Sequence, residues 1–318
     1  MFSGTTSRLG LRGNRRKQLG NKSSAGKQGR NKGKSRKRQK TAARWIKGGE
    51  KALLLGGLLA ALLFLVLFFR PPTAPPPPRP PIPAPIPVPP VKINIFCVII
   101  DDLGHNRAAA APFLELDQPV ALAFLPMRPH SRELAREAHE TGKTVLLHLP
   151  MEPVGYPTVD PGKGAILVSF LPDEIERTIT NDLEEFPFAA GINNHMGSKA
   201  TSGERTMLAV LNVIKKKGLF FIDSRTSADT VAYKLAKGMK MSTGERDVFL
   251  DNERTPEDID IQAGKLLDRA EERGWAIGIG HPYPETADAL RRLAEEARRR
   301  GIRWGTVEEV LARADSGN

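Results

Sequence analysis

The sequence predicts an α/β fold: a distorted (β/α) barrel of seven or eight units, preceded by a single transmembrane helix. From residue 93 onward, short β-rich apolar runs alternate with helical patterns, which is typical of a mainly parallel sheet. The alternation continues to residue 318 without a sequence repeat or a second linker, so we expect one domain. An uninterrupted apolar run at 52–69 predicts the membrane helix.

The first 51 residues form a basic segment. They carry 17 Lys and Arg residues and one acid, Glu50, whereas residues 93–318 carry 28 basic and 35 acidic residues. The formal net charge of +12 therefore describes neither part of the chain. Because the segment has few large apolar side chains, it cannot offset the entropy of folding, and we expect a disordered arm. We interpret the arm as a topology determinant; the alternative is binding of anionic lipid or nucleic acid, and nucleic acid is not favoured.

The apolar run at 52–69 lies between Lys51 and Arg70 and is long enough to cross the hydrocarbon core as a helix. A cleaved signal peptide is the alternative, but its apolar region has only about 7 to 15 residues, and small residues follow it. The positive-inside rule places the basic arm in the cytoplasm. We therefore expect a single-pass protein of the inner (cytoplasmic) membrane with a periplasmic or otherwise extracytoplasmic C-terminal domain.

A Pro-rich linker, 70–92, follows the apolar run. Residues 71–90 contain 13 of the protein's 26 prolines, a composition that favours extended polyproline II and a stiff spacer. An SH3-type ligand is the alternative interpretation. The linker leaves residues 93–318 as the folded domain.

Eight short segments of this domain have the pattern of strands. They are 94–100, 120–125, 144–149, 190–194, 219–222, 248–250, 275–279 and 302–304. Helical patterns lie between them. In one of these, Ile175, Ile179, Leu183 and Phe186 share one face and acids occupy the other, so the helix is expected to cover the sheet.

Residues of ligand type follow the predicted strands, at the end where parallel sheets build their active sites. In strand order they are Asp101 and Asp102, then His148, His195, Asp223, Asp251 and His281. Each has a plainer alternative, because an Asp after a strand often caps the next helix and a lone His is more often a structural hydrogen-bonding residue. Together they predict one functional site at the carboxyl-terminal edge of the sheet, because neighbouring parallel strands end at the same side. The remaining histidines, His105, His130 and His139, are assigned no role.

The composition limits the kind of metal site. The single cysteine, Cys97, excludes a disulfide framework within the chain and a Cys-rich zinc module. Any metal would therefore be bound by His and carboxylates. The neighbouring carboxylates of Asp101 and Asp102 repel each other unless a cation lies beside them, which favours a metal or an Arg partner.

Several segments resemble one family. The Asp-Asp pair after the first strand, HLPMEP at 148–153, NNHMGS at 193–198, DSRTS at 223–227 and IGHPYPET at 279–286 occur in this order. Together they resemble the divergent polysaccharide deacetylases, distant relatives of the metal-dependent carbohydrate esterases of family 4, which remove N- or O-acetyl groups from cell-wall sugars. The resemblance covers 94–310 and implies a distorted (β/α) barrel.

The resemblance also implies roles for individual residues. The relatives have their metal-binding histidines in one His-x-x-x-His segment, which this sequence lacks, so the two histidines would come from separate strands. Zinc is the favoured metal, since two imidazoles disfavour calcium and magnesium. The implied catalytic residues are Asp101 as base and His281 as acid; the implied metal ligands are Asp102, His148 and His195; the implied supporting or substrate-binding residues are Asp223, Arg225, Asn194 and Asp251.

The resulting hypothesis is a membrane-anchored, metal-dependent hydrolase that removes acetyl or other acyl groups from an envelope polysaccharide such as a peptidoglycan-type glycan. The alternative is a catalytically silent envelope protein that keeps the barrel as a glycan-binding or scaffold surface. Release of acetate from acetylated glycans would separate the two.

Overall fold

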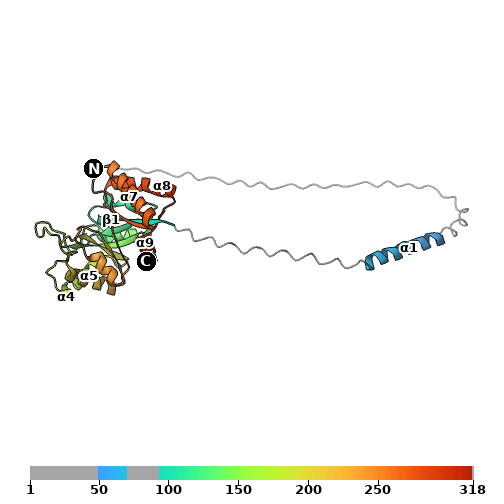
Figure 1. Ribbon diagram of the computed structural model, residues 1–318, viewed down its shortest axis with the longest axis horizontal. Helices are drawn as coiled ribbons and strands as arrows, with labels where there is room; N and C mark the ends of the chain where they lie inside the picture. The colour runs from blue at the N-terminus through green and yellow to red at the C-terminus, as the bar shows by residue number, and fades with distance from the viewer. Residues whose placement is uncertain (1–48, 70–92, 317–318) are drawn as a thin grey trace, which may run out of the picture. The chain divides into compact units, whose positions relative to one another are not determined.

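The computed structural model describes residues 49–69 and 93–316, and the side chains of 55–69 and 93–316 (Figure 1). The chain divides into an N-terminal unit and a C-terminal domain. The predictions of a disordered arm at 1–51 and of a stiff linker at 70–92 lie outside the described residues, except that residues 49–51 belong to a helix and the arm was predicted three residues too long.

In the N-terminal unit, helix α1 (Gly49–Phe68) contains nearly all of the predicted apolar run. Its described large apolar side chains are exposed; Leu58 and Phe68, for example, expose 67% and 73% of their surface. Among the described residues, no helix combines the length and apolar character needed to span a bilayer.

The C-terminal domain is built on one sheet in which every strand pair is parallel. The strand order is β6-β5-β4-β3-β2-β1-β8-β7, and β9 pairs with the beginning of β1. The strands are β1 (Ile95–Leu103), β2 (Ala121–Phe124), β3 (Thr144–Met151), β4 (Gly191–Met196), β5 (Phe220–Asp223), β6 (Thr243–Glu245), β7 (Val248–Phe249), β8 (Trp275–Gly280) and β9 (Arg303–Trp304).

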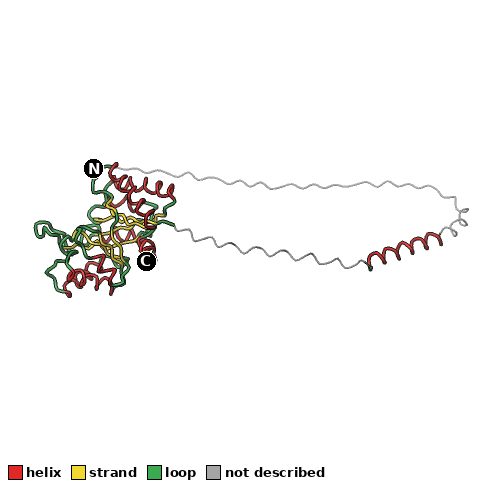
Figure 2. Tube along the Cα trace, in the orientation of Figure 1, coloured by secondary structure: helices red, strands yellow, loops and turns green. Residues whose placement is uncertain are grey.

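Helices connect the strands and lie around the sheet (Figure 2). Local signals set their ends: Asn106 caps the first helix of the domain by accepting from Ala108 N at 2.8 Å, and Gly274 ends α7 in the left-handed conformation that favours glycine. The helices are α2 (Arg107–Leu114), α3 (Ser131–Glu140), α4 (Pro172–Leu183), α5 (Glu204–Lys216), α6 (Ala232–Gly238), α7 (Pro256–Arg273), α8 (Pro284–Arg300) and α9 (Val307–Ser316).

The sheet separates two apolar cores, because successive side chains of a strand point to opposite faces. In β1, Phe96 and Val98 belong to the core shared with the outer helices. Cys97 and Ile99 belong to the inner core, which helix α9 closes with residues such as Leu311. The inner face is thus packed near the beginning of the strands, and its polar positions lie near their ends.

The structure confirms a curled, parallel α/β sheet and shows how it departs from a full barrel. Strands β6 and β7 are separated by only two residues in the chain, yet within 93–316 no ladder of hydrogen bonds joins them, so the sheet is a half-barrel with an open seam. The eight predicted strands correspond to β1–β5 and β7–β9. Strand β6 was not predicted, whereas the predicted helical face at Ile175 and Ile179 is confirmed, because both side chains are buried.

Candidate functional site

The candidate site lies at the carboxyl-terminal edge of the sheet, on its inner face. In β1 and β3, the inner-face residues Ile99 and Leu146 are each followed two positions later by a polar residue, Asp101 and His148. His195 ends the same face of β4. The strand periodicity therefore brings three residues that are distant in sequence to one place.

Asp102 reaches this site through an irregular backbone. Consecutive residues of a regular strand point to opposite faces, so Asp101 and Asp102 would be separated by the sheet. The pairing of β1 with β2 shifts register between Ile100 and Leu103, and Asp102 has a φ of 59°. This left-handed conformation is one that Asp adopts more readily than most residues, and a bulge of this kind redirects a side chain. Both carboxylates consequently face the site.

Three potential ligand atoms converge there. Asp102 Oδ1 lies 2.9 Å from His195 Nδ1 and 3.2 Å from His148 Nε2, and the two ring nitrogens are 3.2 Å apart. These distances resemble those between ligand atoms around tetrahedral zinc, which are about 3.3 Å for bonds of about 2.0–2.1 Å. Asp102 Oδ1 is also buried without a hydrogen-bond partner in the described structure. The three residues therefore fit a divalent metal ion.

Asn193 orients His148. The side-chain amide of Asn193 donates to Asp101 Oδ1 at 2.7 Å and also lies 3.2 Å from Ser224 Oγ. Its oxygen is 2.9 Å from His148 Nδ1, and an amide oxygen only accepts, so Nδ1 of His148 carries the hydrogen. The lone pair of Nε2 then faces Asp102 and is available to a metal, the arrangement that metal-binding histidines ordinarily show.

Burial and charge shift the pKa values of this cluster in opposite directions. Burial raises the pKa of Asp101 above its ordinary value. For Asp102, burial acts in the same direction, but His148 and His195 outweigh it and hold the pKa well below the usual range. Burial acts to lower the pKa of His148, while Asp101 and Asp102 raise it to about 9. Asp101 is therefore the more basic of the two carboxylates.

A His–Asp pair completes the site. His281 follows β8, and its Nδ1 lies 2.9 Å from Asp251 Oδ1. The buried Asp251 also accepts from the backbone N–H of His281 at 2.5 Å and from Thr286 Oγ1 at 2.7 Å. Burial acts to lower the pKa of His281, but the bond to Asp251 raises it overall. His281 Nε2 is directed to the cluster, 3.9 Å from Asp102 Oδ2.

These groups surround a cavity of about 370 Å³. Apolar side chains, including Val159 and Phe249, form part of its wall beside the polar cluster. The cavity is lined by Asp101, Asp102, His148, Pro153, Val159, Asn194, His195, Met196, Ser198, Ser224, Thr226, Phe249 and His281.

Two residues expected to support the site lie outside the cavity lining. Asp223 ends β5 on the face opposite the cluster, where its carboxylate accepts from Thr230 Oγ1 at 2.8 Å and from Tyr233 N at 3.2 Å, near the start of α6. Arg225 pairs with Glu245 at 2.5 Å. The two other expected supporting residues lie at the site: Asn194 lines the cavity, and Asp251 holds His281.

Sequence reasoning missed Asn193 and Ser224. Asn193 stands two residues before His195 and so shares its face of β4, a spacing that could have identified it. Ser224 follows Asp223, and its backbone N–H donates to Asn194 Oδ1 at 2.9 Å. No pattern in the sequence distinguishes Ser224 from an ordinary strand-end serine.

Comparison with known proteins agrees with this arrangement. The family model described as "Divergent polysaccharide deacetylase" matches residues 98–311. The chain is 37% identical over 204 residues to "Uncharacterized protein YibQ" of Escherichia coli (strain K12), covering 64% of this chain and 63% of YibQ. It is 31% identical over 193 residues to an "Uncharacterized protein" of Haemophilus influenzae (strain ATCC 51907 / DSM 11121 / KW20 / Rd), covering 61% of this chain and 68% of that protein.

A solved structure is also similar to this chain. The "uncharacterized protein ATU2773" from Agrobacterium tumefaciens C58 superposes with a TM-score of 0.66 at 25% identity, covering 68% of this chain and 89% of that one. The matched region contains every strand of the half-barrel from β1 to β9 except the beginning of β1. The chain therefore belongs to the divergent polysaccharide deacetylase family.

Proposed function

We propose that the C-terminal domain is a divalent-metal-dependent hydrolase that removes acetyl or other acyl groups from a polysaccharide. One observation carries the proposal: a single cavity holds three convergent ligand atoms, a buried carboxylate and a His–Asp pair. Family membership supports a carbohydrate substrate.

In this proposal Asp102, His148 and His195 hold the metal, which when bound supplies a Lewis acid and lowers the pKa of a water ligand. Zinc suits one carboxylate and two imidazoles better than calcium or magnesium does. Asn193 contributes by fixing the ring of His148, and such supporting bonds are typical of metal-binding histidines.

Asp101 acts as the general base. Its Oδ1 is occupied by Asn193, so Oδ2 takes the proton of the attacking water. The raised pKa of this buried carboxyl makes it a better proton acceptor than an exposed Asp. The water oxygen forms the new bond to the acyl carbon.

His281 acts as the general acid. Asp251 accepts a hydrogen bond from Nδ1 and stabilises the protonated imidazole, which leaves the Nε2 proton for the departing nitrogen or oxygen of the sugar. The acyl–N or acyl–O bond breaks, and the products are a carboxylic acid and a free amine or hydroxyl group. Asp101 thus takes a proton from the attacking water, and His281 gives a proton to the leaving group.

The decisive experiment uses the full-length chain, stripped of metal with EDTA and reloaded with zinc. We expect acetate release from at least one member of a panel of N- and O-acetylated envelope glycans, including peptidoglycan fragments. The stripped chain serves as a control and should be inactive, and the Asp101→Asn variant should be slower by about 10² to 10⁴. If the zinc-loaded chain binds a glycan but releases no acetate from any of them, the domain is a catalytically silent glycan-binding protein.

We further propose that the apolar run at 52–69 anchors the chain in the inner membrane, with the basic segment in the cytoplasm and the domain outside it. The support is the apolar run at 52–69, the 17 basic residues before it and the exposure of its apolar side chains. A helix that is apolar on all sides is stable only where water is excluded. In this position the domain would act on an envelope glycan.

A further inference from the structure

A second cavity lies at the opposite end of the sheet. Its volume is about 510 Å³, and it adjoins Thr243 and Trp275, the first residues of β6 and β8. The candidate active site lies where the strands end, so the two cavities are separated by the length of the sheet. The lining residues are Tyr233, Lys237, Lys240, Met241, Ser242, Thr243, Arg273, Trp275, Arg313, Ala314 and Asp315.

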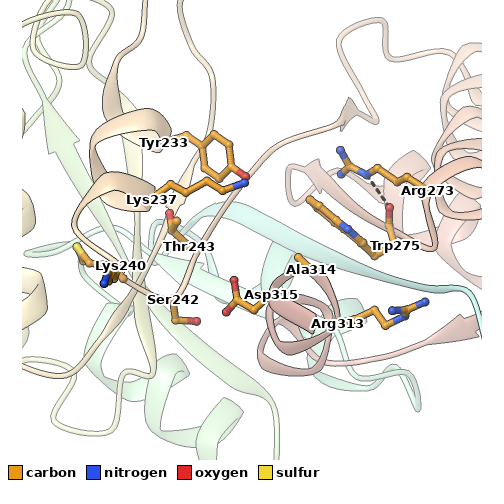
Figure 3. A pocket seen from close by; sticks show the side chains of 11 residues that line it. Tyr233, Lys237, Lys240, Ser242, Thr243, Arg273, Trp275, Arg313, Ala314 and Asp315 are labelled. Carbon is orange, nitrogen blue, oxygen red and sulfur yellow. Dashed lines mark hydrogen bonds between the residues drawn. The ribbon is translucent and has the colours of Figure 1, made fainter. Parts of the chain in front are cut away.

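Besides β6, four elements surround this basic cavity (Figure 3). Tyr233 and Lys237 of α6 lie on one side, and Arg273 and Trp275, from the end of α7 and the start of β8, lie on the other. Asp315 of α9 occupies a third side. The cavity therefore opens at the amino-terminal end of the seam between β6 and β7, next to the helix that closes the inner core.

The cavity carries an excess of positive charge. Within residues 93–316, Lys237, Lys240 and Arg313 form no ion pair, and Asp315 is the one acid in the lining. Basic residues in the last turn of a helix partly compensate the helix macrodipole, which amounts to about half a negative charge at the carboxyl-terminal end of each helix. The ends of α6 and α9 together with Asp315 do not balance three unpaired cations, so an anion is attracted.

Neutral donors are available beside these cations. The hydroxyl of Ser242 and the indole N–H of Trp275 make no hydrogen bond within the described domain, and both residues line the cavity. Arg273 is already held, because its guanidinium pairs with Asp247, donates to Trp275 O at 2.8 Å and lies 3.4 Å from the Trp275 ring centroid. Arg273 thereby fixes the position of Trp275. Lys237, whose Nζ lies 5.7 Å from the Tyr233 ring centroid, provides a charge that no described carboxylate neutralises.

We propose that this basic cavity binds a phosphate-bearing ligand. A phosphate offers three or four oxygens, so it can accept from an amine, a hydroxyl and an indole at once, which a carboxylate with two oxygens does less well. The volume exceeds what a lone phosphate needs and is of the size that small-molecule sites have. The source is either a soluble phosphate ester or the headgroup of a phospholipid.

Titration calorimetry at low salt tests the proposal on the full-length chain in a nonionic detergent. The chain is treated with EDTA, so that phosphate cannot bind through a metal at the other site and the result is independent of the proposed hydrolase activity. The probes are inorganic phosphate and dihexanoyl phosphatidylglycerol below its micelle concentration. We expect saturable binding of one or both; phosphate alone identifies a soluble ester, and the lipid alone a headgroup.

Variants of residues inside and outside the cavity show where the phosphate-bearing probe binds. Lys237→Gln should weaken binding about tenfold, the loss of one charge-assisted hydrogen bond, and Lys237→Glu should weaken it further. Lys234→Gln and Lys234→Glu make the same changes in charge on the same helix, at an exposed residue outside the cavity lining, and should change binding less than about twofold. Asp315→Asn removes the one acid of the lining and should tighten it.

Thermal unfolding of each variant shows whether it is folded before it is titrated. Absence of saturable binding to both probes overturns the proposal. Equal losses for the Lys237 and Lys234 variants would also overturn it, because they would show a diffuse attraction to the surface rather than a site in the cavity.

Discussion

Asp102 and Asp101 illustrate how a single backbone irregularity determines the chemistry of the site. In a regular strand one of the two carboxylates would lie among the helices of the outer core. The left-handed φ of Asp102 costs on the order of 1–3 kcal/mol, and the structure retains it beside a register shift. Strain of this kind at a cavity is consistent with a functional role.

The proposed metal ligands can be tested without any substrate. We expect His148→Ala or His195→Ala to lose most of the bound zinc, because each removes one of three protein ligands. Asn193→Ala keeps all three ligands but releases the ring of His148, and it should weaken zinc binding about 10- to 100-fold.

Elemental analysis after dialysis against a zinc buffer measures these effects, and circular dichroism checks the fold. His139→Ala is a matched control, since His139 lies on the outer helix α3 and away from the cavity. Full zinc occupancy in His148→Ala and His195→Ala would contradict the assignment.

Replacing the proposed base should separate binding from turnover. Asp101→Asn preserves the shape of the side chain but cannot accept the proton of water, so we expect a rate loss of about 10² to 10⁴ with metal content unchanged. The measurement is acetate release under single-turnover conditions, alongside zinc analysis of the same sample. Activity equal to that of the unmodified chain would exclude Asp101 as the base.

Most residues of this site could be predicted from the sequence, although they are far apart along the chain. Strand periodicity and the family resemblance indicated Asp101, Asp102, His148, His195 and His281, which the fold does bring to one cavity. The position of Asp223 could not be predicted, because both faces of a parallel sheet are apolar in sequence and the pattern does not tell which face is inner. Asn193 was missed although its spacing from His195 carried the information.

At the scale of elements, a buried acid in α4 makes the stability of the domain depend on pH. Asp182 is fully buried, neither of its oxygens has a hydrogen-bond partner within 93–316, and Gly164 leaves the room it occupies. Burial and the neighbouring Glu185 raise its pKa to about 8. The folded domain therefore holds a proton on Asp182 at a pH where the unfolded chain, with a pKa of about 3.9, has released it.

This difference predicts how stability changes with pH. Because the folded state binds the extra proton, the contribution of Asp182 is favourable below pH 4 and is lost as pH rises to about 8. Asp182→Asn removes the buried charge, so it should raise the free energy of unfolding by on the order of a few kcal/mol at pH 8.

Urea unfolding of the full-length chain at a series of pH values measures the gain of Asp182→Asn. The gain should disappear near pH 4. Asp173→Asn, on the same helix but exposed, should show no such dependence. A gain that stays constant from pH 4 to 8 would mean that Asp182 is ionised in the folded domain.

Strand prediction failed only where the local pattern is absent. Strand β6 has the sequence Thr-Gly-Glu, too short and too polar to show the alternation that identified the others. It forms because β5 offers a parallel edge with which it pairs. A local sequence pattern does not show which strand another part of the fold will provide as a pairing partner.

At the scale of the whole molecule, the prediction concerns the proposed orientation of the chain in the membrane. A reporter that is active only outside the cytoplasm should function when fused after residue 92, because the 17 basic residues before the apolar run hold the amino terminus inside. Leu62→Arg should weaken insertion, since a central Arg costs about 2.5 to 3.5 kcal/mol.

Leu62→Phe provides the matched control and should insert normally. Activity of a strictly cytoplasmic reporter at the same junction would reverse the proposed orientation, and with it the assignment of an envelope glycan as substrate.

The pairing of β1 between β2 and β8 also determines when this domain can acquire its structure during synthesis. Its first strand gains its second neighbour only after nearly the whole domain has been made, and α9, which closes the inner core, is the last of the described elements. Contacts this distant along the chain form late and slowly. The domain therefore cannot be completed until its C-terminal strands and helix have been synthesised, which would suit the proposed location outside the membrane, because a translocation channel requires an unfolded chain.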